Sequence, residues 1–474
     1  MPLTYDVVIV GARCAGATLA TYLARAGVSV LVLDKSPLPS DAVLSTHTLH
    51  PSGMAVVDEL GLGAAVRGHS PEMSSIRFDW NGGRLDVPFE RGHGEYCPRR
   101  KRFDGLLQDA ARQAGAELHD RTRVTSLLLR DGRVHGVEVE GAHGARHEVY
   151  ARLVVGADGR NSRVAEQLGA ESYLSYEAPR GMYWGYFPAP SGWGQSEQYP
   201  AGMVLHRSGA TIAVAFHTDD DQLLIGALPL RRDLPMFRAD PLASLRRTLR
   251  ELPLFAPLVA PEPSEPLRGF IGDRYFFRRP VGPGWLLVGD AGHHKDFLSG
   301  DGMSEAMLRA RAAAGTIIEA LGAATQAQAA ALYEHFWRSR DVEALPLFFH
   351  ARDLADEHDA GVLDRAVFRH LSAHADDRVR FGGIFSRRVA PQDVLKPARV
   401  LRLCVARALR GEPSILREFL RTAKRSQAIE RELRARRALL AAVDVAPRAQ
   451  SRDAEHVTHV LERVASSPSA ASPR

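Results

Sequence analysis

Hydrophobic residues at the start of the chain form two short continuous runs on either side of a glycine-containing turn. Residues 5–10 (Tyr-Asp-Val-Val-Ile-Val) predict a buried strand, residues 11–16 a tight turn, 17–26 a helix, and 28–33 a second strand. Continuous apolar runs of this length are typical of strands that are covered on both faces, as in parallel sheets. The order of elements therefore predicts a right-handed βαβ unit.

The pattern changes twice further along the chain. From about 171 to 280, aromatic and β-branched residues at 182–187 and 211–217 stand between Pro, Gly and Asp turns, which predicts an antiparallel sheet. Before this region we expect a helix at 101–115 and strands at 124–129, 134–139 and 153–155; after it, a strand at 285–288, a helix at 302–321 and mostly helix beyond 325. The chain thus leaves its first sheet and later returns to it.

Composition limits the class of protein. The chain has 474 residues, 45% hydrophobic and 25% charged, which excludes a disordered or fibrous protein and predicts two or three globular domains. No run approaches the roughly 20 apolar residues of a membrane span, and the N-terminus lacks the basic start of a signal peptide. Three distant cysteines (Cys14, Cys97, Cys404) indicate a reducing cytoplasm, and the preference for Arg over Lys suggests a bacterial genome.

Positive charge is concentrated near the C-terminus. The formal net charge is only +5, too little to predict nucleic-acid binding, yet residues 386–438 hold 15 Lys and Arg against 5 Asp and Glu. Apolar residues there share one helical face: Val394, Leu395, Val400, Leu401, Leu403, Cys404, Ala408 and Leu409. We expect a packed helical cap; contact with a second subunit and weak contact with an anionic membrane surface are the alternatives.

A glycine turn and an acidic residue form the first candidate site. Gly11 and Gly16 lie between a buried strand and a helix, and Asp34 ends the next strand. Gly11 permits the tight turn, Gly16 lets the helix pack closely, and the helix N-terminus attracts a pyrophosphate while Asp34 accepts ribose hydroxyls. Arg13 replaces the usual middle glycine, which is compatible with a bound dinucleotide if its φ is negative.

Two more strand-turn-helix junctions follow. Residues 154–162 (Val-Val-Gly-Ala-Asp-Gly-Arg-Asn-Ser) form the second, and residues 285–292 (Trp-Leu-Leu-Val-Gly-Asp-Ala-Gly) form the third, before His293, His294 and a Gly-Asp-Gly at 300–302. Asp301 is expected to cap the helix that begins there. The His pair lacks a third ligand at zinc spacing, so no metal site is expected, and no Gly-x-Ser-x-Gly elbow suggests a hydrolase.

With three motifs in this order, residues 5–345 resemble the FAD-dependent monooxygenase superfamily, which includes aromatic hydroxylases such as para-hydroxybenzoate hydroxylase. The resemblance implies an α/β protein with a Rossmann-like FAD-binding domain, an antiparallel β-sheet substrate domain and a C-terminal helical region. The expected boundaries are 1–170 (FAD-binding, with an excursion to the substrate domain near 72–97), 171–280 (substrate), 281–345 (return to FAD-binding), 346–440 (basic helices) and 441–474 (flexible tail with a short helix near 452–465).

The resemblance also implies non-covalent FAD, and NAD(P)H that binds transiently and leaves. The residues expected to bind FAD are Gly11, Arg13, Cys14, Ala15, Gly16, Asp34, Lys35, Arg100, Val124, Asp158, Gly289, Asp290, Gly300, Gly302 and Met303. The amides at 300–303 would stabilise negative charge on a reduced flavin. We expect His47, His293 and His294 to be the polar groups nearest the flavin, with His47 as the candidate catalytic residue.

The expected reaction is oxygen transfer, with NAD(P)H and O2, to an aromatic or unsaturated small molecule. Aromatic residues at 183–187 alternate as in a strand, and about two of Tyr183, Trp184, Tyr186 and Phe187 are expected to line a pocket. A reductase of prenyl chains and a flavin halogenase remain alternatives, although the Trp-x-Trp-x-Ile-Pro motif of tryptophan halogenases is absent. A non-enzymatic FAD-stabilised scaffold is a further alternative. The protein is expected to be a monomer or homodimer.

Overall fold

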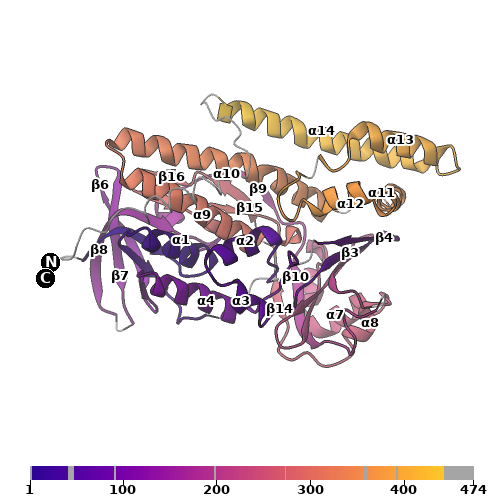
Figure 1. Ribbon diagram of the computed structural model, residues 1–474, viewed down its shortest axis with the longest axis horizontal. Coiled ribbons are helices and arrows are strands. Elements are labelled where there is room, and N and C mark those ends of the chain that lie inside the picture. The colour runs from indigo at the N-terminus through magenta and orange to yellow at the C-terminus, as the bar shows by residue number, and fades with distance from the viewer. Residues whose placement is uncertain are drawn as a thin grey trace.

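A computed structural model describes residues 3–40, 47–89, 92–142, 144–196, 199–272, 274–356, 361–390 and 393–441. Figure 1 shows two sheet-containing parts side by side, with the C-terminal helices forming a layer along one edge of both. The expected tail at 441–474 and its helix near 452–465 lie almost wholly outside the described residues. The fold is the expected mixture of a Rossmann-like FAD-binding domain, a second sheet and C-terminal helices.

The first sheet holds the βαβ unit that the hydrophobic pattern predicts. Its described strands run in the order β16-β17-β8-β1-β2-β5, with β7 beside β8 and β6 beside β7. The strands are β1 (Leu3–Val10), β2 (Val30–Leu33), β5 (Glu117–His119), β6 (Arg123–Arg130), β7 (Arg133–Glu140), β8 (Arg146–Gly156), β16 (Val281–Gly282) and β17 (Trp285–Leu287). β2, β5, β8 and β17 extend the parallel sheet around β1, so the turns after β1, β8 and β17 meet at one edge.

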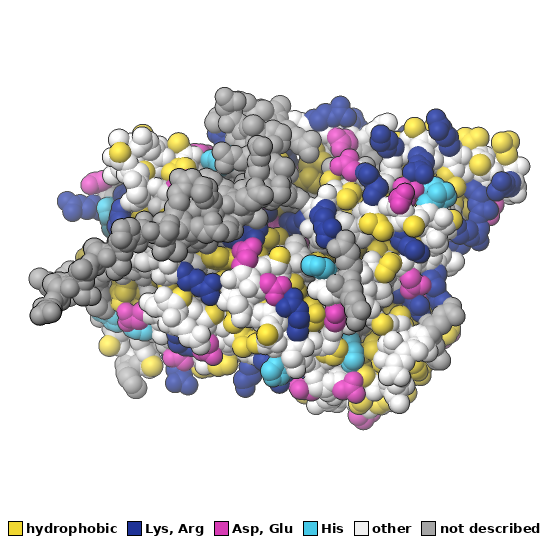
Figure 2. Space-filling view, in the orientation of Figure 1, with side chains coloured by type: hydrophobic (Ala, Val, Ile, Leu, Met, Phe, Trp, Pro, Cys, Tyr) yellow, Lys and Arg dark blue, Asp and Glu magenta, His cyan; other side chains and the backbone are white. Residues whose placement is uncertain are grey.

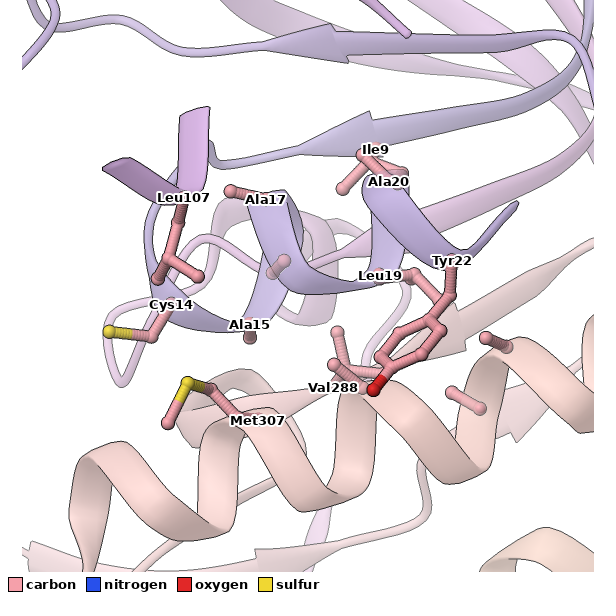
Figure 3. Packing of buried hydrophobic residues seen from close by; sticks show 14 of the residues in the cluster. Ile9, Cys14, Ala15, Ala17, Leu19, Ala20, Tyr22, Leu107, Val288 and Met307 are labelled. Carbon is pink, nitrogen blue, oxygen red and sulfur yellow. The ribbon is translucent and has the colours of Figure 1, made fainter. Parts of the chain in front are cut away.

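Helices cover this sheet and bring their N-termini to the same edge. They are α1 (Cys14–Arg25), α2 (Pro51–Glu59), α3 (Gly63–Arg67), α4 (Arg100–Gln113), α5 (Arg163–Gln167) and α9 (Gly302–Leu321). Small residues of α1 allow close packing: Figure 3 shows Ala15 and Cys14 beside Met307 of α9, in a cluster that also contains Leu107 of α4. Burial of this cluster fixes the two helix N-termini relative to the sheet edge.

The second sheet is mixed rather than purely antiparallel. Its strands run in the order β14-β10-β13-β12-β11-β3-β4, and the single departure is that β11 pairs with β3 in parallel. They are β3 (Ser75–Trp80), β4 (Gly83–Pro88), β10 (Met182–Pro188), β11 (Gly202–Ser208), β12 (Thr211–Thr218), β13 (Gln222–Ala227) and β14 (Arg268–Phe270). The parallel pair arises because β3 comes from a distant part of the chain, where no hairpin turn dictates its direction.

Smaller elements join the two sheets. Strands β9 (Ser172–Glu177), β15 (Arg274–Arg278) and β18 (His293–His294) form a three-stranded sheet. The 3-10 turn η2 (Gly289–Ala291) precedes β18, and the 3-10 turn η3 (Phe297–Ser299) follows it. The outer face of the second sheet is covered by η1 (Arg231–Asp233), α6 (Leu234–Ala239), α7 (Pro241–Leu249) and α8 (Phe255–Leu258). The inner face is left for the functional site.

The C-terminal helices pack only partly as expected. They are α10 (Gln326–Ala355), α11 (Gly361–Ala373), α12 (Ala375–Gly382), α13 (Pro397–Ala408) and α14 (Ser414–Ala441). Cys404 is buried against Leu363 and Ile415, but Leu401 is 43% exposed and Leu409 84% exposed, so the expected apolar face is not wholly covered. Val394 instead belongs to a separate cluster with Trp80 and Leu85. None of the helices in the described ranges is long and apolar enough to cross a bilayer.

Candidate functional site

The turn after β1 is built around close backbone contacts. Gly11 has φ +106, and a Cβ there would lie 2.4 Å from the carbonyl oxygen of Ala157. A Cβ on Gly16 would lie 1.8 Å from the carbonyl oxygen of Gly11. Only glycine fits at either position, so the backbone of this turn is accessible to a ligand at the start of α1. Arg13 has φ −96, the negative value that its side chain requires at this turn.

Asp34 holds the turn from the end of β2. Its Oδ2 accepts a hydrogen bond from the backbone N–H of Ala12 at 2.9 Å, and its Oδ1 accepts one from Ser36 at 2.9 Å. The side chain is buried in the turn yet lines the adjoining cavity. A carboxylate in this position can order the glycine turn and still offer its remaining lone pairs to ribose hydroxyls.

A cavity of about 880 Å³ begins at this turn and extends to the start of α9. Its lining includes every residue expected to bind FAD except Gly16: Gly11, Arg13, Cys14, Ala15, Asp34, Lys35, Arg100, Val124, Asp158, Gly289, Asp290, Gly300, Gly302 and Met303. Gly16 lies beneath the turn, where its lack of a side chain permits the packing. The glycine cradle, the size of the cavity and the helix N-termini at its two ends fit a dinucleotide.

Arg100 and Cys14 meet at the wall of this cavity, which we call the flavin cavity after the cofactor expected to bind there. Arg100, the first residue of α4, donates to the Asp104 carboxylate at 2.9 and 3.0 Å. The Cys14 thiol donates to the same carboxylate at 3.4 Å, and burial raises its pKa to about 12. Cys14 is therefore a neutral wall residue rather than a nucleophile.

Two aspartates end the strands of the other junctions. Asp158 accepts hydrogen bonds from the Ser162 hydroxyl at 2.5 Å and from the Arg163 backbone at 2.7 Å, so it orders the start of α5. Asp290 lies 3.2 Å from His294 Nδ1. Burial raises the pKa of Asp290, but His294, His293 and Lys295 together outweigh burial and lower it overall, so this carboxyl is ionised at neutral pH.

His47 is not among the residues that line the flavin cavity. Its Nε2 contacts the Tyr186 hydroxyl on β10, and its backbone φ is +61. Burial, followed by the positive charges of Arg100 and Arg99, holds the pKa of His47 well below 6.5. His47 is thus a neutral imidazole between the two sheets. His293 is neutral for the same first reason, since burial lowers its pKa to about 4.

A second, apolar cavity of about 240 Å³ adjoins the first. It lies between the inner face of the mixed sheet and helices α10 to α12, and it shares Thr48, Met182, Phe297, Ser299 and Gly300 with the flavin cavity. Aromatic and aliphatic side chains dominate its lining, among them Phe78, Trp80, Met203, Leu205, Phe216, Phe368, Phe381 and Phe385. This apolar cavity opens beside the start of α9, where the amides of Gly302 and Met303 lie.

The alternation on β10 separates its aromatic residues. Trp184 lines the flavin cavity and Tyr186 contacts His47, whereas Tyr183 and Phe187 point into the cluster beneath α6 to α8. The lining residue that the aromatic pattern did not indicate is Met182, which borders both cavities.

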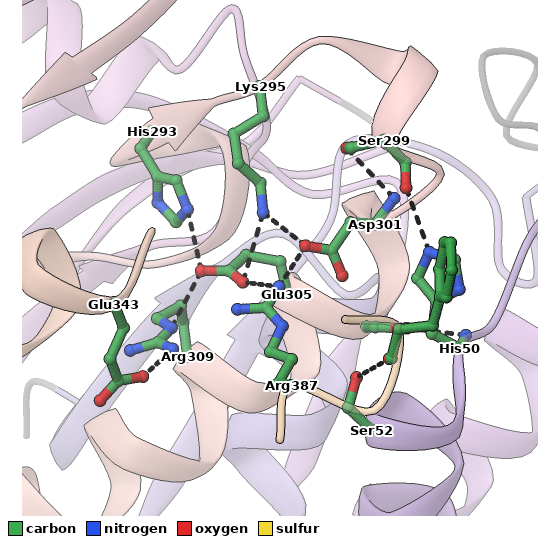
Figure 4. A network of polar contacts seen from close by, with 12 residues as sticks. His50, Ser52, His293, Lys295, Ser299, Asp301, Glu305, Arg309, Glu343 and Arg387 are labelled. Carbon is green, nitrogen blue, oxygen red and sulfur yellow. Dashed lines mark hydrogen bonds and ion pairs between the residues drawn. The ribbon is translucent and has the colours of Figure 1, made fainter. Parts of the chain in front are cut away.

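A buried network of charges joins the two cavities (Figure 4). Lys295 Nζ lies 2.8 Å from Asp301 Oδ2 and 3.3 Å from Glu305 Oε2, and the Arg387 guanidinium contacts both carboxylates. The expected helix cap at Asp301 is wrong: its side chain makes no cap hydrogen bond, because the two cations attract it instead. The i,i+4 spacing of Glu305 and Arg309 is the one sequence signal for this network.

Comparison with protein families identifies the cofactor class. Residues 4–184 match the family model described as an FAD binding domain, and residues 99–314 match the one described as an FAD dependent oxidoreductase. The first match covers the glycine turn, Asp34 and Asp158; the second reaches Asp290 and the start of α9. Both sets of residues meet at the flavin cavity.

Curated relatives match the chain over different lengths. Digeranylgeranylglycerophospholipid reductase 1 of Methanopyrus kandleri is 29% identical over 339 residues, 67% of this chain and 82% of the relative. Reductase 2 of the same organism is 36% identical over 172 residues, 35% of this chain and 40% of the relative. Protein FixC of Escherichia coli is 33% identical over 174 residues, 35% of this chain and 39% of that protein. The chain therefore aligns with less than half of the last two relatives.

Solved structures share most of the fold. The probable FAD-dependent monooxygenase PqsL of Pseudomonas aeruginosa is 23% identical with a TM-score of 0.61, covering 81% of this chain and 99% of its own. The myxobacterial chondrochloren halogenase CndH is 20% identical with a TM-score of 0.65, covering 85% and 96%. The family matches over residues 4–314 identify the chain as an FAD-dependent oxidoreductase, and the solved structures share its fold.

Proposed function

We propose that the protein is a monooxygenase that uses FAD, NAD(P)H and O2 to transfer one oxygen atom to an apolar aromatic or unsaturated small molecule. The observation that supports this most is the apolar cavity beside the flavin cavity at Gly300. Bound FAD would supply the electron transfer and the oxygen chemistry. The aromatic lining, with Phe78 flanked edge-on by Phe368 and Phe381, suits a planar or unsaturated ligand.

The chain's own residues would bind FAD and orient it. Asp34 and the α1 N-terminus would hold the nucleotide half of FAD, and Asp158 and Asp290 the middle of the molecule. The amides at Gly302 and Met303 would face negative charge on the reduced ring. Phe297, shared by both cavities, would exclude water where they join.

His47 and Tyr186 would act beside this junction. The neutral imidazole Nε2 and the phenol oxygen are in contact, and burial raises the pKa of Tyr186 to about 12. The pair therefore forms a hydrogen bond in which both groups are neutral. We propose that the pair fixes the orientation of strand β10 and its Trp184, which lines the flavin cavity. This differs from direct contact between His47 and a flavin.

NAD(P)H is proposed to bind transiently at the open end of the flavin cavity. Arg123, Arg160 and Arg163 line that cavity and would attract the phosphates of a nicotinamide nucleotide. The protein is proposed to work in the cytoplasm as a monomer or homodimer. Its three cysteines are free and buried, which suits a reducing compartment.

The test is oxidation of NADH and NADPH by the FAD-loaded protein, with O2 uptake followed in parallel, over a panel of phenols, quinolones and polyketide-like aromatics. We expect one compound to stimulate both rates and to gain one oxygen atom from labelled O2. Stimulation of nucleotide oxidation without O2 uptake, or no gain of labelled oxygen with any consumed compound, would contradict the proposal.

The second candidate is reduction of an isoprenoid double bond. The apolar cavity and the similarity to a digeranylgeranylglycerophospholipid reductase over 82% of that protein favour it. Incubation without O2, with reduced FAD enzyme and a geranylgeranyl compound, separates the two candidates. A reductase would add two hydrogens to the chain, whereas a monooxygenase would leave it unchanged.

A further inference from the structure

Asp296 is a buried carboxyl group without a cation in direct contact. It follows β18 at the wall of the flavin cavity, and the residue is 1% exposed. Its Oδ1 accepts a hydrogen bond from the Leu298 backbone at 3.0 Å, while its Oδ2 has no hydrogen-bond partner among the described residues. A buried polar atom that is left unpaired calls for a functional or solvent-based explanation.

Three neighbouring side chains share this property. The hydroxyls of Tyr275 and Tyr176, and Nε2 of His294, are also buried without a hydrogen-bond partner in the described parts of the chain. The Tyr275 ring centroid lies 5.3 Å from that of Tyr176 and 5.2 Å from that of His294. With Asp296, these side chains form a group of buried polar residues, and ordered water molecules would satisfy their free atoms. We call these four residues the acid cluster.

Charges on the packed elements set the protonation of Asp296. Burial raises its pKa to about 7; His294 and then Arg180 act to lower it, and Asp356 acts to raise it. The remaining charged groups that act on the tyrosines of the cluster are Arg160 and Arg352. Burial raises the pKa of Tyr275 well above 10, so the tyrosines stay protonated. Asp296 is therefore the carboxyl group of the cluster, and it can gain and release a proton near neutral pH.

The carboxyls that follow it along the chain behave in the opposite way. Burial raises the pKa of Asp301, but Arg387 and Lys295 outweigh burial and lower it. Glu305 is held ionised in the same manner. Asp301 and Glu305 thus serve the charge network, while Asp296 is left as a buried acid in the wall of the flavin cavity.

We propose that Asp296 supplies the proton consumed in the flavin cavity, with His294 and Asp290 as the route that restores it. This rests on the proposed function, whose overall reaction is R–H + O2 + NAD(P)H + H⁺ → R–OH + NAD(P)⁺ + H2O. One oxygen atom enters the substrate, the other leaves as water, and one proton must come from the protein or solvent. Asp290 has a side chain 44% exposed, lines the flavin cavity and contacts His294, which links that cavity to the buried cluster.

The same proton demand appears without any substrate. Reoxidation of the reduced enzyme follows FADH⁻ + O2 + H⁺ → FAD + H2O2, in which two electrons pass from the flavin to oxygen and one external proton is consumed. Dithionite and O2 are then the only reagents. A test on this half-reaction separates failure of the acid from failure to find the substrate.

The first experiment is infrared titration of the FAD-loaded protein between pH 5 and 9. We expect a carboxylic acid band that disappears near pH 7 in the wild type, is absent in Asp296→Asn and returns in Asp296→Glu. The control is Asp219→Asn, because Asp219 is equally buried but both its oxygens accept hydrogen bonds, from Ser70 and Arg102. Loss of the band in the control, or its persistence in Asp296→Asn, would overturn the assignment.

The second experiment measures reoxidation rates over the same pH range. We expect the wild-type rate to fall above pH 7, and Asp296→Asn to be slower by about tenfold or more at pH 6, as for loss of a general acid. Asp296→Glu should recover part of the rate, and Asp219→Asn should match the wild type. If Asp296→Asn is as fast as the wild type at pH 6 and stays fast at pH 9, only the absence of negative charge matters, and proton supply by Asp296 is wrong. FAD content of each variant, measured after denaturation, shows that the cofactor is retained.

Discussion

Arg387, in the segment after α12, forms an ion pair with Glu305 in the first turn of α9. The two residues are far apart in sequence, and the Arg387 side chain is only 10% exposed. Phe385, two residues earlier, lines the apolar cavity. One buried contact therefore fastens the C-terminal helical region over the apolar cavity and ties it to the helix that begins at the flavin cavity.

Replacing this cation should loosen the cap. Arg387→Gln leaves Asp301 and Glu305 buried with less positive charge, and removal of one partner of a buried pair costs about 3 to 5 kcal/mol. We expect a lower free energy of unfolding by that amount in urea denaturation. Arg402→Gln, an exposed arginine on α13, is the control and should change little. Equal stability of the two variants would show that Arg387 does not hold the cap.

Gly11 should tolerate no side chain. Gly11→Ala meets both a strained φ of +106 and a Cβ contact of 2.4 Å, so we expect loss of bound FAD and reduced stability. Gly115→Ala is the matched control, because Gly115 has φ +102 with open space around it and should lose only the backbone strain, about 1 to 3 kcal/mol. FAD content and unfolding are measured on both. Retention of FAD by Gly11→Ala would mean that the turn does not approach the cofactor closely.

Asp34→Ala should weaken FAD binding without preventing it. The substitution removes acceptors for ribose hydroxyls and for the Ala12 amide, a loss of about 1.5 to 3 kcal/mol, or roughly ten- to hundredfold in affinity. Quenching of FAD fluorescence during titration of the apoprotein gives the dissociation constant. Asp109→Ala, an exposed residue on α4, should bind FAD as the wild type does. An unchanged affinity for Asp34→Ala would remove this carboxylate from the cofactor site.

Stability should depend on pH through Asp296. Its pKa is about 7 in the fold and about 3.9 when unfolded, so between these values the folded state binds more protons and stability falls as pH rises. Asp296→Asn removes this effect. We expect the variant to gain on the wild type from pH 4 to pH 7, by up to about 4 kcal/mol, with a constant difference at higher pH. Urea denaturation at several pH values measures it; a difference independent of pH would contradict the raised pKa.

The basic helices should bind membranes only weakly. Figure 2 shows Lys and Arg side chains scattered among hydrophobic ones over the region of α13 and α14, and Leu409 and Leu420 are exposed there. We expect slight flotation with anionic liposomes, lost in 0.5 M salt (about a 4 Å screening length) as exposed charges are screened. Tight, salt-resistant binding that is abolished by Leu409→Ser would instead indicate an apolar membrane contact.

Sequence reasoning succeeded where the determinants are local. The helix expected at 302–321 has those bounds in the structure, because a continuous helical pattern begins at Gly302 and ends before Gly322. Gly11 and Asp34 were identified because the turn and the strand that carry them lie within one βαβ unit. Each of these signals is contained in a few neighbouring residues.

The rest depends on residues that meet only after folding. In the sequence, Arg387 cannot be distinguished from the many surface arginines, and only the folded cap places it beside Glu305. Asp296 likewise resembles an ordinary turn residue, and its neighbours Tyr176 and Tyr275 are known only from the structure. Leu409 was expected on a packed helical face but is exposed, for the same reason. The local sequence does not determine which face of a helix packs against another element. Asp301 was interpreted as a cap because Lys295 and Arg387 could not be placed.

The strand order has a consequence for how the polypeptide matures on the ribosome. One edge of β3 stays unpaired until β11, more than a hundred residues later, has been synthesised. The outer edge of β8 stays unpaired until β17, near residue 285, has been synthesised. Such non-local pairing slows folding and leaves strand edges open for longer. The second sheet needs β14, which ends at Phe270, and the first sheet needs β17, which ends at Leu287. Premature termination before residue 268 would therefore leave both sheets incomplete and yield an aggregation-prone product rather than a smaller flavoprotein.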